Sequence, residues 1–501
     1  MPQSTFFSTR FARSLALVFL FATALTIRLY DLTDLPLDFH PTRQLLSAMK
    51  ARALYFETQP DGIPTWKLEA GIRLARLKAD VEPVVFERLV AFTYRFTGEQ
   101  VWVARFYSSF FWLAGGIFLF LLVNELVSFE GALFSTAYYL FYPYAIIASR
   151  SFQPDPLMVM LTISFWWLFL RWMRSSAWSY ALLAGLVGGF AILIKFSAAF
   201  FVIGAVLGLI FTRFNLREIL RNTQVWAMAL LGVIPGLAYL YYGIYVLGSL
   251  GSQFVGRFFP SLLISPSNYL QWATKVNLAA GGLFIMLALL SFFLVKQKPM
   301  HGLMIGLWGA YLVYAVFFDY HVATHDYYHL PFIPIVALSL APLGEWVTAH
   351  WAEINIQGYK RSALCLILLY GLFSVIWSAR NQMKAIDYRP DAVMWAEIGE
   401  KLAHEPTAMA LTQDYGSRLE YYGLTSAGIW PTVDDLSHQI LRRGGNSFAR
   451  TFENLVRNKS YFLVTDFDEL KKQPELKTRL QSYPVYAEND GYIIYQLRNP
   501  K

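Results

Sequence analysis

Residues 179–213 read SYALLAGLVGGFAILIKFSAAFFVIGAVLGLIFTR, and Lys195 is the only charged side chain before Arg213. A run this apolar is typical of membrane-spanning segments, and its length suits two crossings of the hydrocarbon core near the lower limit. The polar break at Lys195-Phe196-Ser197 separates the two. The stretch therefore predicts two transmembrane helices, at 179–195 and 198–213.

Apolar residues dominate the rest of the 501-residue chain as well. Hydrophobic side chains make up 56% of it and charged ones only 15%, whereas soluble domains carry about 25% charged residues. A soluble domain could not bury so much apolar surface, so lipid must form part of the solvent. Composition thus excludes a wholly soluble enzyme, a disordered chain and a fibre. The net charge of +8 fits basic cytoplasmic loops and anionic lipid head groups better than nucleic acid.

About eleven spans follow from the same reasoning. The first continues past the cleavage-like Ala22-Thr23-Ala24 to Tyr30, so we expect it to be retained rather than removed as a signal peptide. Besides the two spans above, the others lie near 14–30, 102–123, 131–149, 156–172, 226–247, 276–295, 302–318, 329–348 and 361–379.

The charges of the connecting loops predict the orientation of these spans. Lysine and arginine concentrate in cytoplasmic loops. The alternate loops that share a side with Arg10 and Arg13 are basic, except for the short neutral loop 124–130. An odd number of spans then places the chain after 380 on the outer face. The same face would hold the loop 31–100, the turn 150–155, the loop 248–275 and the segment 319–328.

Two segments of the outer loop 31–100 have apolar stripes with helical spacing. Both predict amphipathic helices lying in the membrane surface, and the basic stretch between them could face lipid phosphates. The stripes consist of Leu45, Met49, Ala53 and Phe56 in the helix expected over 41–56, and of Val85, Leu89, Phe92 and Phe96 in the helix expected over 83–96; the basic stretch contains Lys67, Arg73, Arg76 and Lys78.

The composition becomes that of a soluble domain after Arg380. The predicted organisation is a polytopic α-helical transmembrane domain over 1–379, which includes the outer loop, followed by a small outer α/β domain over 380–501. One helix and three strands are expected in the second domain, at 390–404 and at 408–413, 461–465 and 492–497.

Ionisable residues near the spans gather on the outer face. Such residues are costly at membrane depth, so each is a candidate functional group. A random scatter of tolerated charges would not select one face. The set comprises Asp38, His40, Arg150, Asp155, Lys195, Arg257, Lys275, Asp319, His325 and Asp326.

Four different sequence motifs follow one another along the chain at these outer ends. An acidic residue just after the first span opens a surface helix in LDFHPTRQ at 37–44. Pro143-Tyr144 is followed by SRSFQPD at 149–155. A glycine-rich span runs from Gly188-Gly189 to Lys195, and the tyrosine-rich HDYYHLP occupies 325–331.

The order of these motifs, their spacing and their common side of the membrane resemble those of the GT-C superfamily of polyprenyl-phosphate-sugar-dependent glycosyltransferases. The resemblance is to the branch that contains the protein O-mannosyltransferases and the lipid A aminoarabinose transferase. One departure concerns the first motif, where many relatives have an acidic pair and this chain has Asp38-Phe39-His40. A metal or second-carboxylate role is therefore not carried over to this first motif.

The resemblance implies transfer of a sugar from a polyprenyl-phosphate donor to an acceptor at the outer face, with inversion. It implies that Asp38 is the general base that accepts the acceptor's proton, with Asp155 as a second carboxylate in the site. The leaving phosphate requires cations and hydrogen-bond donors. The donors expected there are Arg257, Lys195, Tyr327, Tyr328 and Arg150, and the residues expected to line the site are His40, His325 and Asp326.

Each assignment has a simpler structural alternative. Asp38 and Asp155 could be helix N-caps, and Lys195 could reach water at the interface. Interfacial tyrosines are common without any ligand. His321, His325 and His329 are spaced by four, but interfacial histidines are commoner than ligand sets. We therefore expect no cofactor, with a divalent metal as the alternative.

Two other function classes stay open. A lipid-linked saccharide transporter or flippase would need polar groups at mid-bilayer and an internal repeat, neither of which is evident. A non-catalytic scaffold of a glycan assembly complex would suit the outer domain. The acceptor could be a protein, a lipid or a glycan. Because the chain has a single cysteine, Cys365, we expect the inner (plasma) membrane of a bacterium rather than an endoplasmic reticulum.

Overall fold

The computed structural model describes residue 7 and residues 9–248, 250–251, 258–353, 358–436 and 447–498. The chain forms two compact units. Most of the outer loop 31–100 groups with the C-terminal residues rather than with the spans. The first unit contains Met1–Leu32, Ala79–Phe86 and Trp102–Ile386, and the second contains Thr33–Lys78, Glu87–Val101 and Asp387–Lys501.

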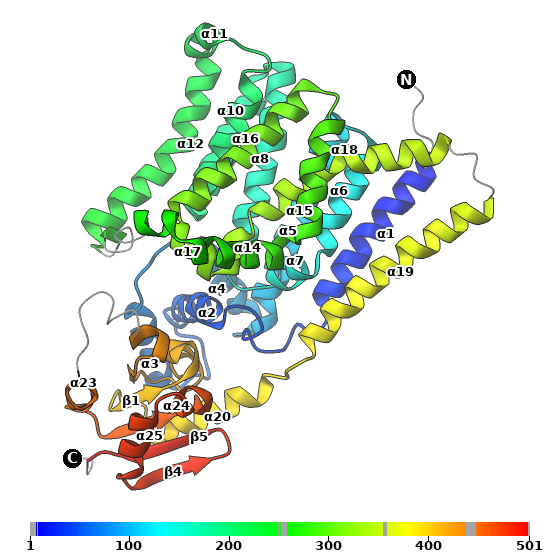
Figure 1. Cartoon of the computed structure of the whole chain (residues 1–501). Coiled ribbons are helices and arrows are strands. Elements are labelled where there is room, and N and C mark those ends of the chain that lie inside the picture. Colours follow the sequence, from blue (N-terminus) through cyan, green and yellow to red (C-terminus); the bar gives the residue numbers. More distant parts are fainter. Residues whose placement is uncertain are drawn as a thin grey trace. The chain divides into compact units, whose positions relative to one another are not determined.

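The first unit is helical throughout its described part (Figure 1). Its helices are α1 (Arg10–Leu29), α5 (Val101–Leu126), α6 (Phe129–Phe141), α7 (Pro143–Ala148), α8 (Asp155–Ser175), α9 (Trp178–Ile194), α10 (Ala198–Ile210), α11 (Leu216–Arg221), α12 (Thr223–Tyr241), η1 (Tyr242–Val246), η2 (Pro260–Ile264), α14 (Pro266–Ala280), α15 (Gly282–Leu290), η3 (Ser291–Leu294), α16 (Lys298–Phe317), α17 (Asp319–Thr324), η4 (Asp326–His329), α18 (Phe332–Glu353) and α19 (Gly358–Met383).

Six helices in the described part of the chain are long and apolar enough to cross a membrane, or seven if the bent pair α14–α15 with η3 is one span. The predicted class of a polytopic helical membrane protein is confirmed, whereas the count of eleven stays a prediction. Several expected spans are short or broken. Two of them are α9 and α10, which end and begin on either side of Lys195-Phe196-Ser197 as expected.

Two predicted spans are interrupted, one at a proline and the other at a glycine. The expected span 131–149 breaks between α6 and α7 at Pro143, which lacks an N–H for the helix ladder. The expected span 276–295 is bent by 84° at Gly281, whose φ of 74° suits glycine. The preceding loop, predicted to continue to 275, is helical from Pro266 onward, because proline is favoured in a first helical turn.

Small residues bring α10 and α16 into close contact. A Cβ built on Gly306 would lie 2.1 Å from the carbonyl oxygen of Gly204, and one on Gly302 would lie 2.2 Å from that of Gly208. Each helix thus carries two glycines four residues apart at the contact, an arrangement that lets backbones approach within a membrane. This contact fixes α10, which follows Lys195.

The second unit surrounds a five-stranded sheet with the order β2-β1-β3-β5-β4. β1 is parallel to β2 and β3, whereas β5 is antiparallel to β3 and β4. Its elements are α2 (Pro41–Phe56), α3 (Thr65–Arg76), α4 (Val85–Thr97), α20 (Arg389–Lys401), β1 (Ala408–Leu411), η5 (Gln413–Gly416), α21 (Ser417–Tyr422), β2 (Gly428–Ile429), α23 (Phe448–Val456), β3 (Tyr461–Val464), α24 (Phe467–Lys471), α25 (Pro474–Gln481), β4 (Val485–Asn489) and β5 (Tyr492–Gln496).

The two predicted amphipathic helices differ in what covers their apolar stripes. The stripe of α2 is buried in the protein, with Leu45 at 0% and Phe56 at 1% exposure, so the prediction that this stripe faces lipid is wrong. On α4, by contrast, Phe92 is 55% and Phe96 76% exposed, as a helix at a lipid surface would require. The basic stretch between them is itself helical, as α3.

Candidate active site

The ends of three elements of the first unit meet at the predicted polar residues. Asp155 is the first residue of α8, and Lys195 caps the C-terminus of α9. Tyr327 and Tyr328 lie in the short helix η4. Figure 1 shows α7, α14 and α17 together at one end of this unit and α11 at the opposite end. The basic residues around α11 are those that predict a cytoplasmic loop.

An ion pair forms the centre of this cluster. The Lys195 Nζ lies 2.8 Å from Asp155 Oδ1, and the two side chains are 13% and 1% exposed. The N-cap of α8 is Pro154 rather than Asp155, so the capping alternative is wrong. Asp155 instead places a buried carboxylate at the N-terminus of the helix, where the helix dipole favours negative charge. Because Lys195 is paired, it does not simply reach into water.

The second carboxylate oxygen of Asp155 has no partner in the described part of the chain. Oδ2 is buried and accepts no hydrogen bond. An unsatisfied oxygen of a buried carboxylate is costly, and it marks a position where a ligand donor would be stabilising. The sequence indicates the carboxylate but not that one of its oxygens is unsatisfied, which depends on how its neighbours pack.

Aromatic rings cover the ammonium group of Lys195. Its Nζ lies 5.3 Å from the ring centroid of Tyr327 and 5.6 Å from that of Tyr328, distances at which a cation is attracted to the ring face. Tyr314 donates a hydrogen bond of 3.0 Å to the carbonyl oxygen of Tyr328, which fixes this turn. Four sequence-predicted residues, Asp155, Lys195, Tyr327 and Tyr328, are thus brought together.

Asp326 is held beside this cluster by a residue that the sequence reasoning gave no role. Tyr144, at the start of α7, donates a hydrogen bond of 3.1 Å to Asp326 Oδ1. The motif Pro143-Tyr144 was the available signal. The break at Pro143 lets α7 present Tyr144 to η4, although the two residues of the pair are 182 positions apart in sequence.

The histidines nearby are used in structural contacts. His329 Nδ1 lies 2.9 Å from the Tyr311 hydroxyl, and its Nε2 lies 2.9 Å from the Val322 carbonyl oxygen. His325 Nδ1 lies 2.7 Å from the Thr324 hydroxyl. Over the ranges that the structure describes, no three His, Cys, Asp or Glu side chains are grouped to hold a metal ion.

Arg150 is buried against the ends of other helices. Its Nη2 donates to the carbonyl oxygens of Tyr30 at 2.6 Å and Asp31 at 2.9 Å, and Nη1 contacts the Met383 sulfur. These bonds tie the turn before α8 to the C-terminal ends of α1 and α19. Its predicted phosphate contact stays a prediction, and Arg257 lies outside the described residues.

Asp38 belongs to the second unit and precedes α2. The N-cap of α2 is His40, with φ of 44°, so Asp38 is not the cap. Asp38 Oδ1 instead accepts a hydrogen bond of 3.3 Å from the amide of Gln44, which also donates to the Phe39 carbonyl oxygen at 2.6 Å. Gln44 is fully buried, so it holds the position of a partly exposed carboxylate.

The electrostatic surroundings of Asp38 include Tyr388. Burial raises the pKa of the Tyr388 phenol, and the negative charges of Asp38 and Asp34 raise it further, against the opposing charge of Arg418. Asp34 accepts a hydrogen bond of 3.0 Å from the backbone N–H of Tyr388. The segment around Asp38 is therefore attached to the residues that begin the C-terminal part of the chain.

Comparisons with known proteins agree with the predicted resemblance. The model of the dolichyl-phosphate-mannose-protein mannosyltransferase family matches residues 81–242. No curated protein sequence matches the chain significantly.

Solved structures cover nearly the whole chain. ArnT from Cupriavidus metallidurans bound to undecaprenyl phosphate is similar with a TM-score of 0.61 and 16% identity, over 96% of this chain and 97% of that one. The apo state of the same protein is similar with a TM-score of 0.59 and 16% identity, over 96% of this chain and 98% of that one. A third similar structure is the oligosaccharyltransferase AglB of Archaeoglobus fulgidus, solved in complex with an inhibitory peptide and a dolichol-phosphate. Its TM-score is 0.50 and its identity 11%, over 98% of this chain and 75% of that one. The chain therefore has the GT-C fold of ArnT, and its residues 81–242 match the mannosyltransferase family model.

Proposed function

We propose that this protein is a membrane glycosyltransferase that moves a sugar from a polyprenyl-phosphate donor to an acceptor at the outer face of a bacterial inner membrane. One observation carries the proposal. The buried pair of Asp155 and Lys195, with an unsatisfied carboxylate oxygen and two tyrosines over the ammonium, lies in a fold shared with a protein that was solved with undecaprenyl phosphate bound.

Lys195 supplies the cation for the donor phosphate. An ammonium group has three donors, and Asp155 uses one of them. The others can donate to phosphate oxygens, with the hydroxyl groups of Tyr327 and Tyr328 as further donors. Charge-assisted bonds of this kind stabilise the negative charge that develops on the leaving phosphate. We assign Arg257 and Arg150 to the same phosphate.

An apolar cavity between helices of the first unit suits a prenyl chain. It has a volume of about 380 Å³ and is formed by α8, α9, α10 and α12, with Phe165, Gly188 and Gly232 among its lining residues. Phe196, which directly follows Lys195, also lines it. We assign the first isoprene units of the donor to this cavity, because Phe196 joins its lining to the chain segment that holds Lys195.

Asp38 is the proposed general base. It accepts the proton of the acceptor hydroxyl as that oxygen attacks the anomeric carbon, while the bond from this carbon to the phosphate oxygen breaks. Polyprenyl phosphate leaves with the electron pair, and the sugar configuration inverts. His40, His325 and Asp326 would line the site. No step requires a metal or another cofactor, and the acceptor is a protein, lipid or glycan hydroxyl.

Purified full-length protein tests this proposal in liposomes with a panel of polyprenyl-phosphate-linked hexoses and pentoses and a membrane extract as acceptor. The expected result is free polyprenyl phosphate together with sugar on the acceptor. Movement of intact donor across the bilayer without bond cleavage would instead indicate a transporter. Neither movement nor cleavage for any donor, with a folded protein, would favour a scaffold and contradict the proposal.

A further inference from the structure

A cavity of about 280 Å³ lies within the second unit and is lined by residues other than those assigned above. It is lined by Gln413, which follows β1, and by Thr465, which follows β3. These two strands are parallel neighbours. In open α/β sheets, ligands bind outside the carboxyl ends of parallel strands. The position in the sheet thus makes this cavity a candidate binding site.

The amide of Gln413 is held in a fixed orientation at the cavity wall. Its Nε2 donates to the Thr465 carbonyl oxygen at 3.0 Å, and its Oε1 accepts from the Thr465 hydroxyl at 2.9 Å. A glutamine amide has two N–H donors and two acceptor positions on its oxygen. Among the described residues, one N–H and one acceptor position of this amide have no further partner and could bond a ligand.

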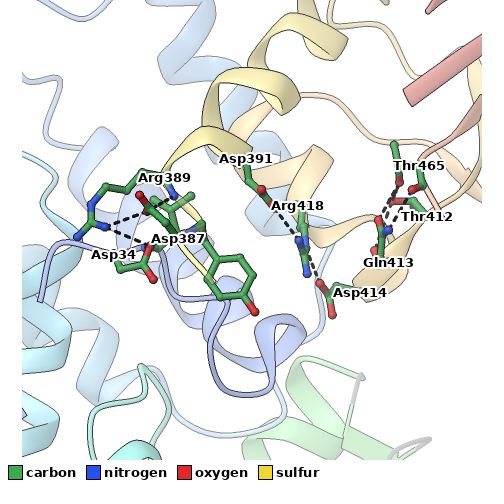
Figure 2. A network of polar contacts seen from close by, with 11 residues as sticks. Asp34, Asp387, Arg389, Asp391, Thr412, Gln413, Asp414, Arg418 and Thr465 are labelled. Atoms are coloured by element: carbon green, nitrogen blue, oxygen red, sulfur yellow. Dashed lines mark hydrogen bonds and ion pairs between the residues drawn. The ribbon is translucent and has the colours of Figure 1, made fainter. Parts of the chain in front are cut away.

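An arginine and two carboxylates form a rigid neighbouring wall. Arg418 donates from Nη1 to Asp391 Oδ2 at 2.8 Å and from Nε to Asp414 Oδ2 at 2.6 Å. Figure 2 shows Arg418 between these carboxylates, with Gln413 beside Thr412 and Thr465. All three side chains of the ion-paired group are mostly buried, so they present fixed polar atoms without having to reorganise.

Trp395 provides an unsatisfied donor in the lining of the same cavity. Its side chain is 1% exposed, and its Nε1 has no hydrogen-bond partner in the part of the chain that the structure describes. Leaving a buried donor unsatisfied costs free energy. A ligand oxygen at this position would remove that cost.

The loop after β1 is held in an unusual backbone conformation. Asp414 and Tyr415 have φ of 54° and 52°, in the left-handed region that non-glycine residues seldom adopt, and Gly416 follows with φ of 78°. Strained backbone of this kind clusters at ligand sites, where the surrounding structure maintains it. Here the bond from Arg418 to Asp414 maintains it.

The charges that line the cavity and its volume indicate which class of ligand it can bind. Asp391 and Asp490 line it with Arg418, and Asp414 shares that arginine, so an anionic ligand would be repelled. The groups in its lining are an amide, carboxylate oxygens, an indole N–H and the aromatic ring of Phe467, which suit hydroxyl groups and one face of a sugar ring. The volume lies just below the roughly 300–1,000 Å³ of drug-sized pockets. We propose that this cavity binds one residue of a saccharide that is neutral or carries an amino group.

Saturation-transfer NMR on the full-length protein tests this binding, in a detergent without sugar head groups and without donor lipid. The probes are the methyl glycosides of mannose, galactose, N-acetylglucosamine and glucosamine, each at up to about 10 mM, because a single sugar ring is expected to bind with millimolar affinity. The measurement involves no sugar transfer, so its failure would leave the proposed activity untouched.

Two variants change the cavity in different ways. Gln413→Ala removes the oriented amide. Gly491→Leu narrows the cavity, because it adds a large side chain at a lining position and displaces Met394, another lining residue, whose sulfur a Cβ at Gly491 would approach to 2.3 Å. Gln481→Ala, on an exposed position of α25, is the matched control.

We expect at least one glycoside to bind the wild type and Gln481→Ala equally. At least one cavity variant should bind it about fivefold more weakly, the effect of losing roughly 1 kcal/mol. Thermal unfolding checks that the variants are folded, and Gly491→Leu retains every hydrogen bond of Gln413 if Gln413→Ala is unstable. The proposal is overturned if no glycoside binds the wild type, if both cavity variants bind like the wild type, or if the control loses binding as well.

Discussion

Replacing Lys195 by methionine should strongly destabilise the first unit. The side chain keeps its length and apolar stem but loses the ammonium that pairs with Asp155 at 2.8 Å. Since the Asp155 side chain is 1% exposed and its Oδ2 already has no partner among the described residues, a buried carboxylate would then lack compensation. Breaking a buried pair in this way costs about 3–5 kcal/mol.

The reverse change should cost less. In Asp155→Asn the unpaired ammonium belongs to Lys195, which is 13% exposed and has a flexible stem that can reach water. Combining both substitutions should recover part of the loss from Lys195→Met, because no buried charge remains. The interaction energy of the double-mutant cycle should therefore be about 1–3 kcal/mol.

Unfolding of the purified protein by SDS measures these differences. Lys296→Met is the matched control, because Lys296 pairs with Glu345 at 3.7 Å but is 67% exposed, and exposed pairs contribute about 0–1 kcal/mol. The reasoning is refuted if Lys195→Met is no more destabilising than this control, or if adding Asp155→Asn to it recovers nothing.

Three further predictions concern packing, pH and topology. Gly306→Leu should prevent α10 from packing on α16, because even a Cβ at this position would lie 2.1 Å from the Gly204 carbonyl oxygen; size-exclusion chromatography should show loss of monodisperse protein, and a normal elution profile would contradict the contact. Burial raises the pKa of Glu420 despite its ion pair with Lys78, so folding favours its proton and stability should fall as pH rises above the ordinary glutamate range; Glu420→Gln should flatten this dependence in thermal unfolding, and an unchanged slope would contradict it. A reporter fused after residue 380 should be active only outside the cytoplasm, and cytoplasmic activity would reverse the proposed orientation.

The sequence predicts those features that local chemistry determines. The apolar run around Lys195 yields α9 and α10, because lipid permits few other structures. The strands β1 and β3 are recognisable since all of their residues are apolar and buried. The edge strand β4 was missed because most of its residues are exposed, and β2 because it contains only two residues.

Features that depend on distant contacts could not be predicted. The loop charges predict that one face of the membrane holds Asp155, Lys195, Tyr327 and Tyr328. They do not predict the unsatisfied oxygen of Asp155, because it depends on packing between residues 40 positions apart. Contacts between residues far apart in sequence also group most of the outer loop with the C-terminal residues. Arg52 on α2, for example, pairs with Glu99 at 2.8 Å and also donates to a carbonyl oxygen of α21.

The proposed chemistry depends most directly on Asp38. Asp38→Asn keeps the size of the side chain and an oxygen that can accept the bond from Gln44, observed at 3.3 Å. It removes only the charge and the capacity to take a proton. Asp61→Asn, at an exposed position of the same loop, is the matched control.

The decisive measurement is sugar transfer from polyprenyl phosphate by purified Asp38→Asn, alongside its donor binding and thermal stability. If Asp38 is the general base, transfer should fall by about a hundredfold or more while donor binding and stability match those of Asp61→Asn. Near-normal transfer by the folded variant would contradict the assignment, and Asp155 would become the candidate base.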